Sequence, residues 1–267
     1  MTAGEPQRRW RGTFELRELL ESMPGGIDFA VRDFALLTIA GTLTSAFPGR
    51  LVFKGGFVLR HVHGHLRFSK DIDATSFDKA RLLTAPDVSE AIRQASIQNV
   101  VHFAPGVPAN DSSASLDFDN ILVSGEMIPD SQVQVEVSFR EAVVGEPVTA
   151  FIGGPYYHPF GVLVMQPAEM VAEKLRALAQ RIRATDLADL AVLLSTEQLE
   201  DHAIARYAVE KFRLVKHGRL NRSARVERNI AELADSYDDV VRNLFPDAPT
   251  YAEATAVVLP RVRSLIP

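Results

Sequence analysis

The spacing of apolar residues changes near residue 166, and this change limits the architectures open to the chain. Before it, residues 133–139 (VQVEVSF) alternate apolar and polar side chains as a half-buried strand does. After it, apolar residues recur at helical spacing over 168–183, 186–195, 201–216 and 222–245. We therefore expect an α/β domain over 27–165 and an all-helical C-terminal domain over 166–267. Residues 1–26, with a short helix over 14–23 that Met-Pro-Gly-Gly ends, are expected to be an N-terminal appendage.

The first domain reads as strands and helices in alternation. A helix over 29–44 carries an apolar stripe made of Phe29, Phe34, Leu37, Ile39 and Leu43. The other predicted elements are strands at 51–53, 71–74, 116–123, 133–139 and 162–165, helices at 55–64 and 89–97, and a glycine- and proline-rich loop at 153–161. This order predicts an α/β (α+β) fold.

Composition excludes several classes of protein. The 267 residues are 46% hydrophobic and 24% charged, which is typical of one or two globular domains. Cysteine is absent, so disulfides, thiolate zinc sites and cysteine nucleophiles are excluded, and any metal must be bound by oxygen or imidazole. No apolar stretch approaches the roughly 18 residues of a membrane span, so we expect a cytoplasmic protein with no membrane partner.

Two carboxylates lie one residue apart at Asp71 and Asp73. On a strand they project from the same face, and a hard cation such as Mg²⁺ would relieve their repulsion. A solvated pair of turn acids is the alternative. Gly55 and Gly56 follow a strand and permit close approach of phosphate, where Ser69 could add a hydroxyl. Glu136, on the polar face of a later strand, would complete a site for two metal ions if the strands are neighbours.

These segments resemble the AbiEii/AbiGii family of nucleotidyltransferase toxins, which includes the MenT proteins. The resemblance rests on FKGGFVLR (53–60), RFSKDID (67–73), EVSFRE (136–141), AEKLRA (172–177) and DLADL (186–190), in this order over roughly residues 28–195. Phe57 and Thr185 depart from the family pattern, which has Ser or Thr after the Gly-Gly pair and Arg before the helical Asp. Both changes bear on nucleotide affinity, and neither touches the acidic residues.

The resemblance implies a DNA-polymerase-β-like nucleotidyltransferase fold, with a mixed sheet flanked by helices and a helical C-terminal domain. It implies an Mg²⁺-dependent enzyme that transfers a nucleoside monophosphate from an NTP to RNA, with the tRNA 3′ acceptor end as the favoured target, and releases pyrophosphate. A cognate antitoxin is the implied protein partner. The residues assigned to the site are the metal ligands Asp71, Asp73 and Glu136, the further catalytic residues Lys174 and Asp186, and the nucleotide-binding residues Lys54, Gly55, Gly56, Arg67 and Ser69.

Several of these residues also have purely structural interpretations. Lys174 lies on the flank of an apolar helix face that Ile182 is expected to share, so its chain could simply extend to solvent. Asp186 follows Thr185, an expected N-cap, and could complement the helix dipole. Arg60 and Arg67 could bind phosphate or pair with a local carboxylate. The three histidines at 61, 63 and 65 are not interpreted as a metal site, because i, i+2 residues do not share a helix face.

The acceptor is the least constrained part of the hypothesis. Residues 206–228 hold eight Lys and Arg against two acids, which suits a phosphate backbone but also suits a solvated basic face. The N-terminal arginines Arg8, Arg9 and Arg11 are the next candidates. Transfer to a protein or small-molecule hydroxyl, and a non-catalytic protein that binds RNA or a partner on the same scaffold, remain open.

Overall fold

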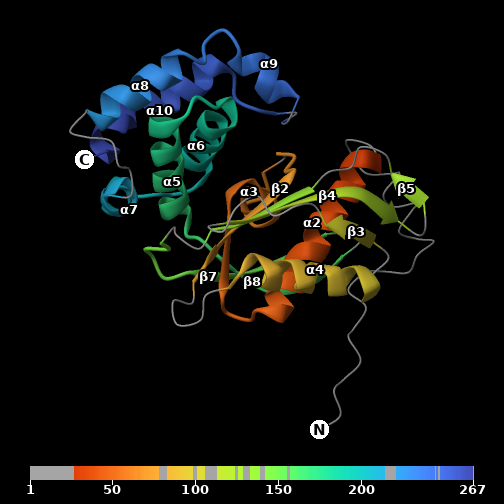
Figure 1. Ribbon diagram of the computed structural model, residues 1–267. Coiled ribbons are helices and arrows are strands. Elements are labelled where there is room, and N and C mark those ends of the chain that lie inside the picture. The colour runs from red at the N-terminus through yellow and green to blue at the C-terminus, as the bar shows by residue number, and fades with distance from the viewer. Residues whose placement is uncertain are drawn as a thin grey trace. The chain divides into compact units, whose positions relative to one another are not determined.

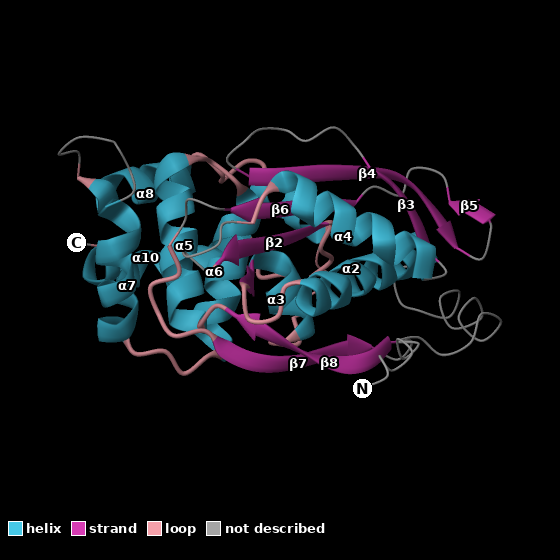
Figure 2. Ribbon diagram, turned by 60° about the horizontal axis from the view of Figure 1, so that its bottom comes forward, coloured by secondary structure: helices cyan, strands magenta, loops and turns pink. Residues whose placement is uncertain are grey.

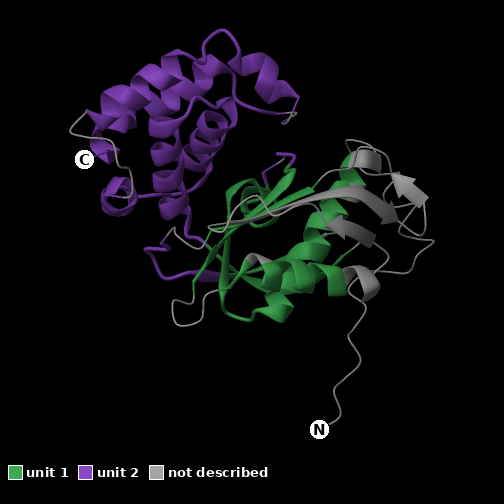
Figure 3. Ribbon diagram, in the orientation of Figure 1, with its two compact units in different colours: residues 1–64, 69–141, 149–164 green, residues 65–68, 142–148, 165–267 purple. Residues whose placement is uncertain are grey.

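The computed structural model describes residues 27–65, 67–77, 83–98, 101–105, 113–123, 126–128, 133–138, 142–154, 157–213, 221–243, 245 and 247–266. The predicted helix at 14–23, the last residue of the strand predicted over 133–139 and the end of the helix predicted over 201–216 lie outside these residues. The chain divides into two compact units (Figure 3). Unit 1 spans 1–64, 69–141 and 149–164, and unit 2 spans 65–68, 142–148 and 165–267. The last crossing between the units, at residue 165, lies beside the expected domain boundary, and two short segments of the first half belong to unit 2.

Unit 1 is built on a mixed β-sheet, coloured magenta in Figure 2. The strands in the described residues are β1 (Leu51–Lys54), β2 (Asp71–Ser76), β3 (Val101–Pro105), β4 (Ser113–Val123), β5 (Glu126–Ile128), β6 (Val133–Ser138), β7 (Val148–Gly154) and β8 (Tyr157–Val164). Their order is β3-β4-β6-β2-β1-β8-β7, and β5 pairs with β4. Parallel pairing joins β2 to β6 and β1 to β8, whereas β1 and β2 are antiparallel. Two strands far apart in sequence, β2 and β6, are therefore direct neighbours.

Three helices in the described part of unit 1 pack with this sheet (Figure 1): α2 (Ile27–Ala46), α3 (Gly55–His61) and α4 (Ala85–Gln98). The predicted apolar stripe of α2 is buried, and the helix packs against β2, β4, β6 and β8. The predicted helix is confirmed, but burial runs without a break over 33–41, so the helix is enclosed on more than the predicted face. α3 ends before the predicted Gly64, which has a φ of 69° and so adopts the left-handed conformation that favours glycine.

The prediction of a loop over 153–161 is wrong, because most of these residues belong to the adjacent strands β7 and β8. Glycine and proline suggested a loop, but Gly153 lies where the two strands approach closely. A Cβ added there would be 3.1 Å from the Pro159 Cα and from the Tyr157 carbonyl oxygen. The glycine thus permits a tight strand pair, which its composition alone does not reveal.

Unit 2 is helical over the described residues after 165, with α5 (Pro167–Gln180), α6 (Ala184–Thr196), α7 (Asp201–Arg213), α8 (Arg222–Ala231), α9 (Tyr237–Arg242) and α10 (Tyr251–Leu265). Its core includes Val171, Leu175 and Leu178 of α5. Ile182, expected on the same apolar face, is 49% exposed because α5 ends at Gln180. None of the helices described is long and apolar enough to cross a membrane.

One prediction for unit 2 is wrong, and one helix of this unit was not predicted. The single helix expected over 222–245 is interrupted by turns between α8 and α9, where the backbone N–H groups of Leu233, Ala234 and Ser236 bond three residues back. Asp and Ser in this stretch compete with the helical backbone for hydrogen bonds. α10 was not predicted, although Thr250 and Glu253 form a capping box at its start. Pro260 inside the helix obscured that signal.

Candidate active site

The acidic residues of unit 1 lie in one row across neighbouring strands. Asp73 of β2 is in register with Glu136 of the parallel strand β6, and Lys54 of β1 is in register with Asp73 on its other side. Asp71 precedes Asp73 by two residues and so projects from the same face. The alternate residue Ile72 is buried, whereas both aspartates are half-buried and Glu136 is exposed. The sheet therefore presents three carboxylates on one accessible face.

Gly55 adjoins this row because it directly follows β1. Its φ of +70° favours glycine, and a Cβ added there would lie 3.3 Å from the Asp73 Cβ and still closer to the Asp73 Oδ2. The absence of a side chain at residue 55 makes room for the Asp73 carboxylate. The Gly55–Gly56 backbone thus begins α3 next to the acidic row.

Ser69 is 4% exposed and its hydroxyl serves the main chain. The Oγ donates to the Asp71 carbonyl at 2.9 Å and accepts from the Asp71 N–H at 3.5 Å. These bonds shape the backbone at the start of β2. The structure therefore places Ser69 as a support of Asp71.

The donors on this face fit a divalent metal ion in chemistry. Carboxylate oxygens are the ligands that hard cations prefer, and Asp71, Asp73 and Glu136 lie on one face of two neighbouring strands. In their present side-chain conformations, no three His, Cys, Asp or Glu residues in the described part of the chain are grouped closely enough to hold a metal. The fit rests on the register of Asp73 with Glu136 and on the space left by Gly55.

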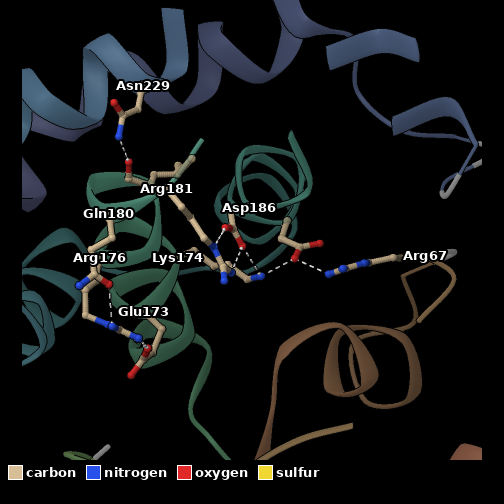
Figure 4. A network of polar contacts seen from close by, with 10 residues as sticks. Arg67, Glu173, Lys174, Arg176, Gln180, Arg181, Asp186 and Asn229 are labelled. Carbon is tan, nitrogen blue, oxygen red and sulfur yellow. Dashed lines mark hydrogen bonds and ion pairs between the residues drawn. The ribbon is translucent and has the colours of Figure 1, made fainter. Parts of the chain in front are cut away.

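A second polar cluster lies within unit 2 (Figure 4). Lys174 of α5 contacts Asp186 at 2.9 Å and Asp189 at 2.7 Å, both on α6. Arg181 donates to both oxygens of Asp186 at 2.8 and 3.2 Å, and Arg67 donates to Asp189. Asp186 and Asp189 are almost fully buried. A buried charge needs a partner, and Lys174, Arg181 and Arg67 supply three positive charges within the unit.

The charges in this cluster keep Lys174 and Asp186 ionised. Burial by itself lowers the pKa of Lys174, but the Asp189 and Asp186 carboxylates outweigh burial and hold that pKa above its usual value. Burial raises the pKa of Asp186, and the Lys174 and Arg181 cations overcome it and lower that pKa to about 2. Lys174 is therefore a cation held by two carboxylates, with a side chain only 15% exposed. The alternative that its chain simply extends to solvent is excluded.

Two arginines of the sequence hypothesis pair with carboxylates. Arg60 donates to Asp33 of α2 at 2.8 Å and lies 4.5 Å from the centre of the Phe29 ring. Arg67 pairs with Asp189, far away in the sequence. The expectation that Thr185 is the N-cap of α6 is wrong. The helix begins at Ala184, and Arg183 is its N-cap.

The basic segment 206–228 is only partly available as a surface. Lys211 is fully buried and binds Glu169 at 2.7 Å and Glu173 at 2.6 Å. Arg213 pairs with Glu210, and Arg228 with Glu232. Lys216 and Arg219 lie outside the described residues. Lys211 therefore belongs to the core of unit 2 and not to a basic surface, whereas Arg222 and Arg225 remain candidates for phosphate contact.

Sequence reasoning gave Asp189 less weight than Asp186, as a candidate surface acid one turn further on, although it is fully buried, and it missed Arg181. Asp189 stands three residues after Asp186 on the same helix face, which is a usable signal once Lys174 is suspected. Arg181 gives no such signal, because it reaches Asp186 from the turn between α5 and α6. The helix expected over 168–183 ends at Gln180, so the sequence did not place Arg181 in this turn.

The fold and the acidic row together define a nucleotidyltransferase. The family model described as nucleotidyl transferase AbiEii toxin, type IV TA system, matches residues 39–264, so the chain belongs to the AbiEii family of nucleotidyltransferase toxins, in agreement with the sequence hypothesis. This family belongs to a type IV toxin–antitoxin system. Enzymes of this kind use an NTP and a divalent metal. No curated protein sequence gave a significant match.

Solved structures show the same fold. MenT4, a nucleotidyltransferase toxin from Mycobacterium tuberculosis H37Rv, is 22% identical with a TM-score of 0.68, and the match covers 96% of this chain and 89% of that one. JHP933 from Helicobacter pylori is 18% identical with a TM-score of 0.54, over 89% and 91% of the two chains. The mixed sheet flanked by helices is thus the expected nucleotidyltransferase fold.

Proposed function

We propose that this nucleotidyltransferase transfers a nucleoside monophosphate from an NTP to RNA, at the 3′ acceptor end of tRNA, and that it requires Mg²⁺. The row formed by Lys54, Asp73 and Glu136, with Asp71 on the same face, is the observation that supports this reaction. In the reaction, the acceptor hydroxyl oxygen bonds to the α-phosphorus while the bond to pyrophosphate breaks. Magnesium supplies charge neutralisation and activation of that hydroxyl.

The protein's own groups have distinct roles in this proposal. Asp71, Asp73 and Glu136 would hold two Mg²⁺ ions, and Lys54 balances part of their charge. The Gly55–Gly56 backbone approaches the phosphates. Lys174 binds the triphosphate as a point charge, and Asp186 orients the Lys174 ammonium. The sequence assigned Ser69 and Arg67 to nucleotide binding; from their contacts with Asp71 and Asp189 we propose that they act by supporting the segment before Asp71.

The biological setting follows from the family. Membership in a type IV toxin–antitoxin family implies a cognate antitoxin. We propose that the enzyme acts in the cytoplasm on RNA, and that the antitoxin counteracts this modification. Capping of the tRNA acceptor end would block aminoacylation and so explain toxicity.

Labelling identifies both the transferred group and the acceptor. The purified protein is incubated with Mg²⁺, a cell lysate and each NTP in turn, labelled with ³²P at the α-phosphate. Label in the tRNA size range, lost on RNase treatment, is the expected result. The same NTP labelled at the γ-phosphate should leave tRNA unlabelled, because pyrophosphate departs.

Other outcomes assign the acceptor differently. RNase-resistant label in a protein band, or label only in a small molecule, would contradict RNA as the acceptor and support the corresponding hydroxyl. Asp73→Asn is the inactive control. No transfer to any species by a folded wild-type protein would contradict the enzymatic proposal.

A further inference from the structure

Asp189 is the most enclosed charge of the unit 2 cluster. Its side chain is 0% exposed, and one oxygen, Oδ2, accepts from both the Lys174 ammonium and the Arg67 guanidinium. The other oxygen, Oδ1, is buried with no hydrogen-bond partner among the described residues. A single carboxylate oxygen thus joins two cations from different parts of the chain.

The two cations belong to functionally different segments. Lys174 is on α5 and is the proposed triphosphate-binding lysine. Arg67 lies on the segment 65–68, which belongs to unit 2 although the chain continues directly into Ser69 and β2. The Arg67 guanidinium also lies 5.6 Å from the centre of the Phe245 ring, so it is fixed by an ion pair and by an aromatic contact.

Stability alone is a poor explanation for this arrangement. Buried ion pairs contribute little net stability, because desolvation of the charges offsets their attraction. A partly unsatisfied buried carboxylate adds a further penalty. Asp189 is therefore better explained by the groups that it holds in place.

We propose that Asp189 is a positioning residue that holds Lys174 and Arg67 at one point, and so fixes together the triphosphate-binding lysine and the segment leading into the metal-binding strand. The role assigned to Lys174 rests on the proposed function. The restraint on segment 65–68 does not, because it concerns only the folded protein.

The first test is Asp189→Asn, which preserves shape and removes the charge. The charged groups that face Lys174 are Asp186, Asp189 and Arg67, and Arg181 shares Asp186 with it. Without the Asp189 charge, burial and Arg67 favour the neutral amine of Lys174, and only Asp186 still opposes them. Binding of a non-hydrolysable NTP, measured by calorimetry from pH 6.5 to 9.5, should stay constant in the wild type up to about pH 9.

In Asp189→Asn the same affinity should fall about tenfold between pH 7 and pH 9, since the charge-assisted contact of Lys174 is lost. Asp201→Asn is the matched control. Its carboxylate pairs with Arg261 at the surface of the same unit, so its pH profile should match the wild type. A purely structural role for Asp189 would weaken binding equally at all pH values.

Hydrogen exchange is the second readout, and it needs no nucleotide. Amides of residues 67–71 should exchange at least about tenfold faster in Asp189→Asn, whereas amides of α8 should not change. Arg67→Met should speed up exchange of the same amides. It should not produce the pH effect on NTP binding, because the ion pair between Lys174 and Asp189 remains. Arg67→Lys should restore slow exchange in part.

The outcomes separate the two ideas. If wild-type protein binds no NTP, the proposed function fails, and hydrogen exchange alone still tests the restraint by Asp189. If Asp189→Asn does not fold, Arg67→Met decides through exchange at residues 67–71. Unchanged exchange in Arg67→Met, or a wild-type pH profile in folded Asp189→Asn, would overturn the positioning role.

Discussion

Gly55 leaves open the space that the Asp73 carboxylate occupies. A Cβ at residue 55 would lie 3.3 Å from the Asp73 Cγ and closer still to its Oδ2, and the backbone φ of +70° is unfavourable for any L side chain. The glycine thus has both a conformational and a steric role. A small residue is needed here because the acidic row needs room.

Gly55→Ala should therefore lose NMP transfer and divalent-metal-dependent NTP binding. Gly49→Ala is the matched control, because Gly49 has a φ of +72° but no atom within 4 Å of its added Cβ. Both changes should lower the free energy of unfolding by about 1–2 kcal/mol through backbone strain. Urea unfolding and label transfer separate the two effects. Equal activity in the two variants would contradict a specific role for the space beside Asp73.

The acidic row gives the second prediction. Asp73→Asn and Glu136→Gln should each reduce label transfer to background, because each removes a metal ligand and leaves an isosteric side chain. Thermal unfolding should change little without metal, since Glu136 is exposed and Asp73 is only half-buried. Glu90→Gln, an exposed carboxylate paired with Arg93, should retain full activity. Near-wild-type transfer by either site variant would exclude that residue as a ligand.

Local patterns predicted the site strands well. The spacing of Asp71 and Asp73 indicated one face, and the alternation around Glu136 placed that residue on the polar side of its strand; the register between β2 and β6 agrees with both. That these strands are neighbours could only be assumed, because strand order depends on contacts between distant segments. The resemblance to the family supported the assumption.

Contacts that depend on tertiary packing escaped prediction. In the sequence, Lys211 looks like part of a basic surface. In the structure it is buried and forms ion pairs with Glu169 and Glu173, which lie one turn apart on α5. Arg67 pairs with Asp189, which lies 122 residues away in the sequence. Helical spacing shows which residues share a helix face, but it does not show which charged residues of other elements pack against that face.

The pKa of Asp186 gives a prediction for pH. This pKa is lowered from 3.8 to about 2 in the folded state, so the ionised carboxylate stabilises the fold above about pH 4, and the stabilisation is lost as pH falls through 2. Asp186→Asn should lower the free energy of unfolding at pH 7 by on the order of 2 kcal/mol. Urea denaturation should show this difference shrinking between pH 4 and pH 2. A difference independent of pH would contradict the ion pairs with Lys174 and Arg181.

The buried charges around Lys211 give a stability prediction. Lys211→Met removes the cation that faces Glu169 and Glu173, and it should lower the free energy of unfolding by about 3–5 kcal/mol. Arg213→Met is the control from the same helix, since its pair with Glu210 is exposed and should contribute at most about 1 kcal/mol. Chemical denaturation of both variants checks this. Similar values would show that Lys211 is not a core residue.

The last prediction concerns the surface that binds the acceptor RNA. Its candidates are two arginines of the basic segment 206–228 that are not buried in the core. Arg222 and Arg225 of α8 are half-exposed, and the Arg222 guanidinium lies 5.3 Å from the centre of the Phe212 ring. If tRNA binds there, Arg222→Glu with Arg225→Glu should weaken tRNA binding about tenfold or more at any sequence, and flatten its salt dependence by about 1–2 in log–log slope. NTP affinity should not change. Arg93→Glu with Arg261→Glu makes the same change in net charge elsewhere and should leave the slope unaltered. Filter binding from 50 to 300 mM salt distinguishes them, and equal slopes in the two double variants would exclude α8 as the RNA-binding face.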